Sequence, residues 1–133
     1  MTGRRLVCVL GALGSAGVLA ACGSQSVSVP QSESTHSGAV LFAQHCSGCH
    51  TLSYAGTQGS ATNVRNRERV DGPNFDQRKE QPDQVLYAIR NGGFSGAIMP
   101  ENIVVGKEAQ QIAAFLAEYS GRKATAPKGP GTG

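Results

Sequence analysis

Clusters of apolar residues in three stretches of this chain predict three helices, and those of the second stretch recur at intervals of three and four. The expected helices run from about Ser37 to Cys46, from Pro82 to Asn91, and from near Gly106 to Gly121. Their apolar faces are expected to contain Val40, Leu41 and Phe42 in the first, Val85, Leu86 and Ile89 in the second, and Ile112, Ala113, Phe115, Leu116 and Tyr119 in the third.

The residues at the ends of these stretches support the same boundaries. Thr35 or Ser37 can cap the first helix, Pro82 is a favoured first helical residue, and Asn91-Gly92-Gly93 is a typical stop signal. No strand-like alternation stands out. Two long loops, about 51–81 and 92–105, remain between the helices, and loops of this length are unusual unless a ligand organises them.

The first 21 residues read as an export signal. Arg4 and Arg5 precede an uncharged apolar run from Leu6 to Ala20, which is shorter than the roughly 20 residues of a membrane span. The run ends in Leu-Ala-Ala-Cys22, which resembles the bacterial lipobox, so we expect Cys22 to be lipidated. An ordinary secretory signal cut near Ala21 and an uncleaved anchor helix are the alternatives. Either cleaved form places the domain outside the cytoplasm, and lipidation places it at the membrane's outer face.

The rest of the chain divides into three expected parts. Residues 22–36 are rich in Ser, Gln and Val and predict a flexible tether, 37–122 form one domain, and 123–133 read as a disordered tail. Without Arg4 and Arg5 the chain has ten basic and nine acidic residues, a balance that excludes nucleic-acid binding by charge. A domain this small has a marginal core, so we expect it to fold poorly without a bound group.

The run Cys46-Ser47-Gly48-Cys49-His50 carries the strongest chemical signal. Two thiols three positions apart can each bond one vinyl group of a porphyrin, and the adjacent histidine then lies beneath the iron, so Cys-x-x-Cys-His predicts covalent attachment of one c-type haem. A zinc site, a redox-active dithiol and a Cys46–Cys49 disulfide are the alternatives. Zinc would need His45 as a fourth ligand within six residues, which hardly allows tetrahedral geometry, and no βαβ context supports a thioredoxin-like dithiol.

Met99 is the expected second iron ligand, opposite His50. It is the sole methionine left once Met1 departs with the signal, and it lies before Pro100 in the loop between the last two helices. Most methionines only fill gaps in a core, but a loop methionine downstream of the haem motif is well placed to reach the iron. A thioether ligand favours reduced iron, and a six-coordinate iron has no free site for oxygen or peroxide.

The order and spacing of these features resemble the small mono-haem class I cytochromes c. The resemblance covers about Ser37 to Gly121 and is carried by the following residues: Gly38 and Phe42, Cys46 to Leu52, Gly72-Pro73-Asn74-Phe75, Asn91-Gly92-Gly93 through Met99-Pro100, and the helix from Ile112 to Tyr119. It implies an all-α fold, with three to five helices and long loops around one covalent haem.

The resemblance also implies contacts and a function. The first and last helices would cross at Gly38, against Ile112 and Phe115, and the Pro73 carbonyl would accept a hydrogen bond from the His50 ring. Phe75 stands where the family has leucine. The implied function is non-enzymatic: a single-electron carrier tethered to the membrane, with a quinol-oxidising complex, a dehydrogenase or a terminal oxidase as partner. The alternative is a haem enzyme or gas sensor in which the sixth iron position is open or Met99 is displaced.

Some residues allow only weaker predictions. His45 is expected at the surface and His36 in the tether, neither with a specific role. Arg65, Arg67, Arg69 and Tyr54 are candidates to contact a haem propionate, because arginine pairs well with carboxylates, although a solvated basic loop is the simpler interpretation of the three arginines.

Overall fold

The computed structural model describes residues 27–94 and 98–125. The expected signal, the lipidation site at Cys22, residues 22–26 of the tether and residues 126–133 of the tail lie outside the described residues. The elements, in chain order, are α1 (His36–His45), β1 (Thr51–Leu52), η1 (Ser53–Ala55), β2 (Thr57–Gln58), η2 (Val64–Asn66), α2 (Pro82–Asn91) and α3 (Gly106–Tyr119). The predicted all-α class is confirmed, and the three helices lie within a residue or two of their expected boundaries.

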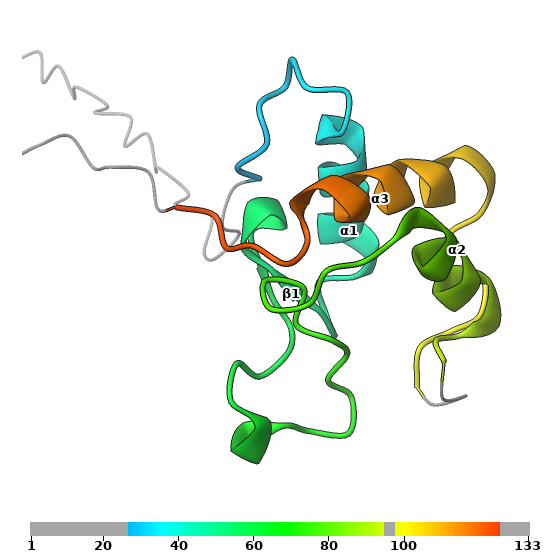
Figure 1. Ribbon diagram of the computed structural model, residues 1–133. Helices are drawn as coiled ribbons and strands as arrows, with labels where there is room; N and C mark the ends of the chain where they lie inside the picture. The colour runs from blue at the N-terminus through cyan, green and yellow to red at the C-terminus, as the bar shows by residue number, and fades with distance from the viewer. Residues whose placement is uncertain (1–26, 95–97, 126–133) are drawn as a thin grey trace, which may run out of the picture.

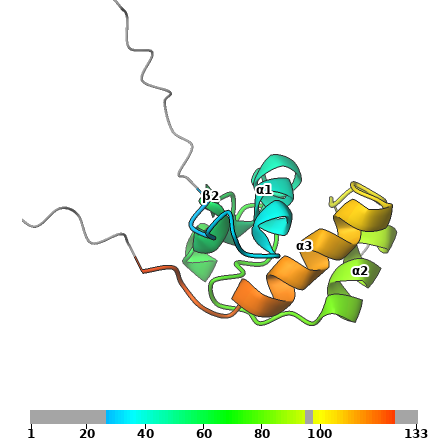
Figure 2. The same cartoon turned by 90° about the horizontal axis from the view of Figure 1, so that it is seen from above.

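Helices α1 and α3 lie against each other (Figures 1 and 2). Gly38 of α1 lies where they meet. A Cβ at Gly38 would lie 2.7 Å from Cβ of Phe115 and would also overlap the carbonyl oxygen of Gln111. The predicted crossing is therefore present, and the atoms nearest to it belong to Gln111 and Phe115. Phe42 and Phe115 are almost fully buried beside it and meet edge to face, with centroids 5.9 Å apart. The missing Cβ lets the two helices approach closely enough to bury these rings.

Helix α2 packs on α3, and local signals set its ends. Pro82 lies in its first turn, where the missing N–H costs no hydrogen bond. Gly92 ends it in the left-handed region, with φ 69°, and the next amide, of Gly93, donates to the Ala88 carbonyl at 2.8 Å. The buried face contains Val85 and Ile89, so this helix presents the expected apolar residues to the core.

The loop between α1 and α2 is held by a small hairpin that the sequence pattern did not reveal. Strands β1 and β2 pair antiparallel, with Thr51 opposite Gln58 and Leu52 opposite Thr57. The amide of Phe75 donates to the Thr51 carbonyl at 2.8 Å, and Leu52 is fully buried. With two residues per strand the hairpin offers too little alternation to detect from sequence.

The segment 27–35 packs against the domain, so the expected flexible tether is wrong for these residues. Val29 is 3% exposed, and the Ser28 amide donates to the Tyr54 carbonyl at 2.9 Å. His36, expected to have no role, bonds the Val29 carbonyl through Nδ1 at 2.8 Å and begins α1. These bonds and the burial of Val29 hold the segment in place.

The C-terminal end of the described chain is bonded to the same 3-10 turn, η1, that holds Ser28. The Ala124 amide donates to Oγ of Ser53 at 2.6 Å, one residue before the Tyr54 carbonyl that holds Ser28. The guanidinium of Arg122 lies over the rings of Tyr54 and Tyr119, 5.3 and 4.8 Å from their centroids. Ordered packing therefore continues to Ala124, past the expected domain boundary at residue 122. Among the described residues, no helix has the length and hydropathy needed to cross a bilayer.

Candidate functional site

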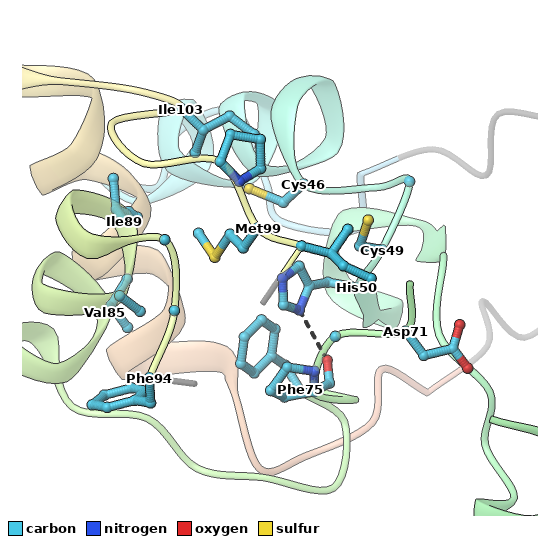
Figure 3. A pocket seen from close by; sticks show the side chains of 18 of the residues that line it. Cys46, Cys49, His50, Asp71, Phe75, Val85, Ile89, Phe94, Met99 and Ile103 are labelled. Carbon is cyan, nitrogen blue, oxygen red and sulfur yellow. Dashed lines mark hydrogen bonds between the residues drawn. The ribbon is translucent and has the colours of Figure 1, made fainter. Parts of the chain in front are cut away.

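A cavity of about 380 Å³ opens between the Cys46–His50 segment, α2, α3 and the loop before Pro100. Helix α2 contributes Val85 and Ile89 to its wall, and α3 contributes Ile112 and Leu116. Figure 3 shows the His50 ring and the Met99 side chain in this space, with Val85 and Ile89 across from them. A largely apolar cavity with a few convergent polar groups is typical of a cofactor site.

The predicted hydrogen bond between His50 and Pro73 is present. Nδ1 of His50 lies 3.1 Å from the Pro73 carbonyl oxygen (Figure 3). A carbonyl only accepts, so Nδ1 carries the proton and Nε2 keeps its lone pair. Burial lowers the pKa of His50, and the bond to Pro73 opposes this only in part. The ring is therefore neutral at neutral pH, with Nε2 free to bind a metal.

Gly72 makes room for this ring. A Cβ at position 72 would lie 2.8 Å from Nε2 of His50 and closer still to two other ring atoms, Nδ1 and Cε1. The Gly72 amide donates to the Cys49 carbonyl at 2.8 Å, which ties the loop to the cysteine segment. Phe75 stacks on the other side of the ring, with centroids 4.8 Å apart and an interplanar angle of 12°. Phe75, which replaces the leucine of the family, is thus accommodated by stacking on the imidazole ring of His50.

The Asp71 side chain connects two parts of the loop that precedes Gly72 and Pro73. Its Oδ2 accepts from the amides of Ala61 and Glu68 at 3.0 and 3.1 Å. These two bonds, with a smaller contribution from Arg67, lower the pKa of the Asp71 carboxyl. An ionised Asp71 therefore organises this exposed loop beside the histidine.

Cys46 and Cys49 are free thiols at the edge of the same cavity. Burial, and to a lesser extent the nearby Cys49, raises the pKa of Cys46 to about 12, so this group is a neutral thiol at neutral pH. The amide of His50 donates to the Cys46 carbonyl at 3.0 Å, which keeps the motif in a helical turn. The Cys46–Cys49 disulfide considered from sequence is not formed here.

Met99 lies in the cavity wall and packs against the hydrophobic core. Gly92 permits the close approach of its loop, because a Cβ there would lie 2.7 Å from the Met99 carbonyl oxygen. The Asn102 amide then donates to the Ile89 carbonyl at 2.8 Å. These contacts with the end of α2 bring Met99 into the cavity that contains His50.

The charged residues of the cavity wall only partly match the sequence prediction. Arg67 and Arg69 line the cavity, whereas Arg65 does not. Tyr54 is a wrong prediction: its ring lies beside Tyr119, at 4.8 Å, away from the cavity, because the described terminal segments pack around it. His45 is exposed, as expected, and lies at the cavity edge.

Arg78 and Glu80 are cavity residues that the sequence analysis missed. Nε of Arg78 lies 2.7 Å from Oε1 of Glu80, and the Glu80 side chain is 4% exposed. Both belong to the charged stretch Arg78-Lys79-Glu80, which reads as solvent-exposed. No periodicity distinguishes the buried member of such a run.

The donor set fits covalent haem c. Two thiols, an imidazole with a free Nε2 and a thioether border one apolar cavity, and Gly72 and Gly92 provide the close approaches that the ring and the methionine loop need. Within residues 27–94 and 98–125, no three His, Cys, Asp or Glu side chains gather as a metal site.

Comparison with known proteins agrees with this assignment. The family model described as cytochrome c oxidase, cbb3-type, subunit III matches residues 33–116, more than half of the chain. Among solved structures, the c-type cytochrome SorU from Sinorhizobium meliloti is similar at 27% identity with a TM-score of 0.52, over 69% of this chain and 97% of that one. No curated protein sequence matches. The chain belongs to the family of cytochrome c oxidase, cbb3-type, subunit III, and is a class I c-type cytochrome whose cofactor is covalently bound haem c.

Proposed function

We propose that Cys46 and Cys49 would hold the haem through thioether bonds and that His50 and Met99 would ligate its iron. The bound haem supplies a one-electron redox change. The protein positions it, excludes water and sets its electronic surroundings. The observation that carries this proposal is the His50 ring, held by Pro73 with Nε2 free, in a cavity bordered by both thiols and by Met99.

The geometry around His50 supports a fixed proximal ligand. Pro73 accepts from Nδ1, Gly72 leaves room for the ring and Phe75 stacks against it. Such a carbonyl partner fixes the orientation of the ring and increases its basicity. A ligand that does not reorient during electron transfer keeps the reorganisation of the site small.

Met99 distinguishes an electron carrier from an enzyme or gas sensor. A thioether in the sixth position leaves no place for oxygen, peroxide or carbon monoxide. Met99 borders the cavity together with apolar side chains such as Ile89, Ile98 and Ile103. A thioether in this apolar part of the wall supports single-electron transfer.

We propose further that Cys22 is lipidated and tethers the domain to the outer face of the cytoplasmic membrane. At least two acyl chains are needed for stable attachment. The described chain packs against the domain from Val27 onward. Covalent geometry allows Cys22 and Val27 to lie at most about 17 Å apart. The domain would stay close to membrane complexes, which raises its effective concentration there.

The partners we propose are membrane redox complexes. A quinol-oxidising complex or a dehydrogenase would supply electrons, and a terminal oxidase would accept them. The description of the matching family, a subunit of an oxidase, favours an oxidase as acceptor.

Covalent attachment can be tested on a denaturing gel. The full chain, made in cells with haem-attachment machinery, should retain haem after denaturation. Replacement of both Cys46 and Cys49 by alanine should abolish this retention, while Cys8→Ser, in the expected signal, should leave it unchanged. Retained haem in the double variant would contradict the proposed linkage.

The anchor can be tested separately. Cys22→Ser should move the haem protein from the membrane fraction to the soluble fraction without loss of haem, whereas Cys8→Ser should remain membrane-bound. If the Cys22→Ser protein stayed with the membrane, lipidation at this residue would be the wrong explanation.

A further inference from the structure

Glu80 is a buried carboxyl group in the wall of the haem cavity. The residue is 3% exposed, and it lines the cavity together with Gln84 and Val85 of α2. Its backbone is fixed, because its amide donates to Oγ of Ser120 at 2.8 Å and Ser120 is itself 1% exposed. This bond fixes the backbone at the point where the buried Glu80 side chain begins.

The carboxyl group is only partly compensated. Oε1 of Glu80 forms an ion pair with Nε of Arg78 at 2.7 Å, but the contact lacks the geometry of a hydrogen bond and the Arg78 side chain is 52% exposed. An ionised carboxylate in such surroundings is costly unless it is fully paired. Glu80 is therefore a group whose charge state responds to a change of charge nearby.

Arg78 is the principal charged partner of the Glu80 carboxyl group, because the other charged residues nearby are exposed or bonded elsewhere. Lys79 is directed away and donates to the carbonyls of Ala117 and Glu118. On α2, Asp83 is exposed and Gln84 is uncharged. Besides Glu80 and the two thiols, the titratable or charged groups of the cavity wall are His45, His50, Arg67, Arg69, Asp71 and Arg78.

We propose that Glu80 couples proton uptake to electron uptake at this site, an inference that rests on the function proposed above. One electron, delivered by a reduced redox protein, adds one negative charge to the cavity. One proton from solvent then adds to the Glu80 carboxylate, with Arg78 at the solvent side, and both leave on reoxidation. Charges interact strongly in a poorly solvated cavity, so the added charge increases the proton affinity of the carboxylate.

The resting state of Glu80 supports this role. Burial raises the pKa of the carboxyl, and Arg78 opposes the rise without cancelling it. The net effect is a raised pKa in the resting state, and the negative charge added on reduction acts in the same direction.

The reduction potential of the holo-protein, measured by spectroelectrochemistry against pH, tests this inference. The potential of the wild type should fall with rising pH between the acid dissociation points of the oxidised and reduced forms. Each tenfold difference in the Glu80 acid constant between these forms changes the potential by about 59 mV in total. Glu80→Gln, of nearly the same shape, should remove this pH dependence. Arg78→Gln should instead shift it to higher pH, because the opposing cation is lost.

Glu118→Gln is the matched control, since Glu118 is exposed on α3 and does not line the cavity; it should behave as the wild type. An infrared difference spectrum of reduction should also show a protonated carboxyl band that is absent in Glu80→Gln. A potential independent of pH in the wild type, or an unchanged pH dependence in Glu80→Gln, would overturn the inference and assign any coupling to another group. A haem protein that remained low-spin and unreactive to carbon monoxide would still leave the proposed electron carrier intact.

Discussion

Gly72 lies against the imidazole ring of His50. A Cβ built at Gly72 would overlap the ring, since it would lie only 2.8 Å from Nε2 and nearer still to Nδ1 and Cε1. The glycine and the histidine belong to segments far apart in sequence, and the Gly72 amide joins them by donating to Cys49. The position of the histidine ring is therefore set by the absence of a side chain as well as by the Pro73 carbonyl.

Gly72→Ala should displace the His50 ring and weaken its bond to iron. Overpacking of this kind costs about 1–3 kcal/mol, which corresponds to a fall of several degrees or more in the melting temperature of a domain this size. The holo-protein should melt earlier and accumulate with less haem. Gly48→Ala is the control, because a Cβ there would contact nothing within 4 Å; equal melting temperatures for the two variants would contradict the steric argument.

Gly38→Ala should separate α1 from α3. The new Cβ would lie 2.7 Å from Cβ of Phe115, and the backbone at Gln111 cannot move without loss of helix geometry. We expect a loss of about 1–3 kcal/mol in the free energy of unfolding, measured by denaturant titration. Ser37→Ala, one residue earlier and exposed, should stay within about 0.5 kcal/mol of the wild type. A similar small effect at position 38 would show that the crossing tolerates a methyl group.

Val29→Ala should loosen the segment 27–35. The substitution removes two buried carbon atoms, worth about 0.8 kcal/mol each, so the free energy of unfolding should fall by about 1.5 kcal/mol. The segment should also become easier to cleave by protease. Val64→Ala tests specificity, because Val64 is 81% exposed and its replacement should have little effect. If Val29→Ala changed neither stability nor cleavage, the segment would not be held as described.

Glu80→Gln should change how stability depends on pH. Since burial raises the pKa of Glu80 in the folded state, the folded protein binds this proton more tightly than the unfolded chain does. The contribution is favourable below the unfolded pKa, near 4.3, and is lost as pH rises through the folded pKa. As pH rises from the unfolded pKa through the raised folded pKa, the melting temperature of the variant should therefore decline less than that of the wild type. Parallel declines would show that Glu80 does not titrate differently on folding.

Much of the fold could be predicted because its signals are local. Pro82 and Gly92 set the two ends of α2 by backbone chemistry, and Gly92 indeed has a φ of 69°. The Cys-x-x-Cys-His run identified the cofactor because covalent attachment of haem requires this spacing of two thiols and a histidine. The family resemblance supplied the bond from His50 to Pro73, which periodicity alone does not indicate.

The missed features depend on contacts between distant segments. Val29 lies in a polar Ser-rich stretch, and its burial follows from the Tyr54 carbonyl that anchors Ser28. Glu80 is buried because Ser120, at the end of α3, holds its backbone. Tyr54 was misassigned for the same reason, since its ring packs with Tyr119 and Arg122 rather than at the cavity.

The visible spectrum of the purified holo-protein, oxidised and reduced, with and without carbon monoxide, tests the central claim most directly. With His50 and Met99 as axial ligands, the reduced spectrum should be low-spin and unchanged by carbon monoxide, and a weak sulfur-to-iron band should be present in the oxidised form. Met99→Ala should lose that band and bind carbon monoxide. A wild-type spectrum that is high-spin and shifts with carbon monoxide would contradict the account and favour an enzyme or gas sensor.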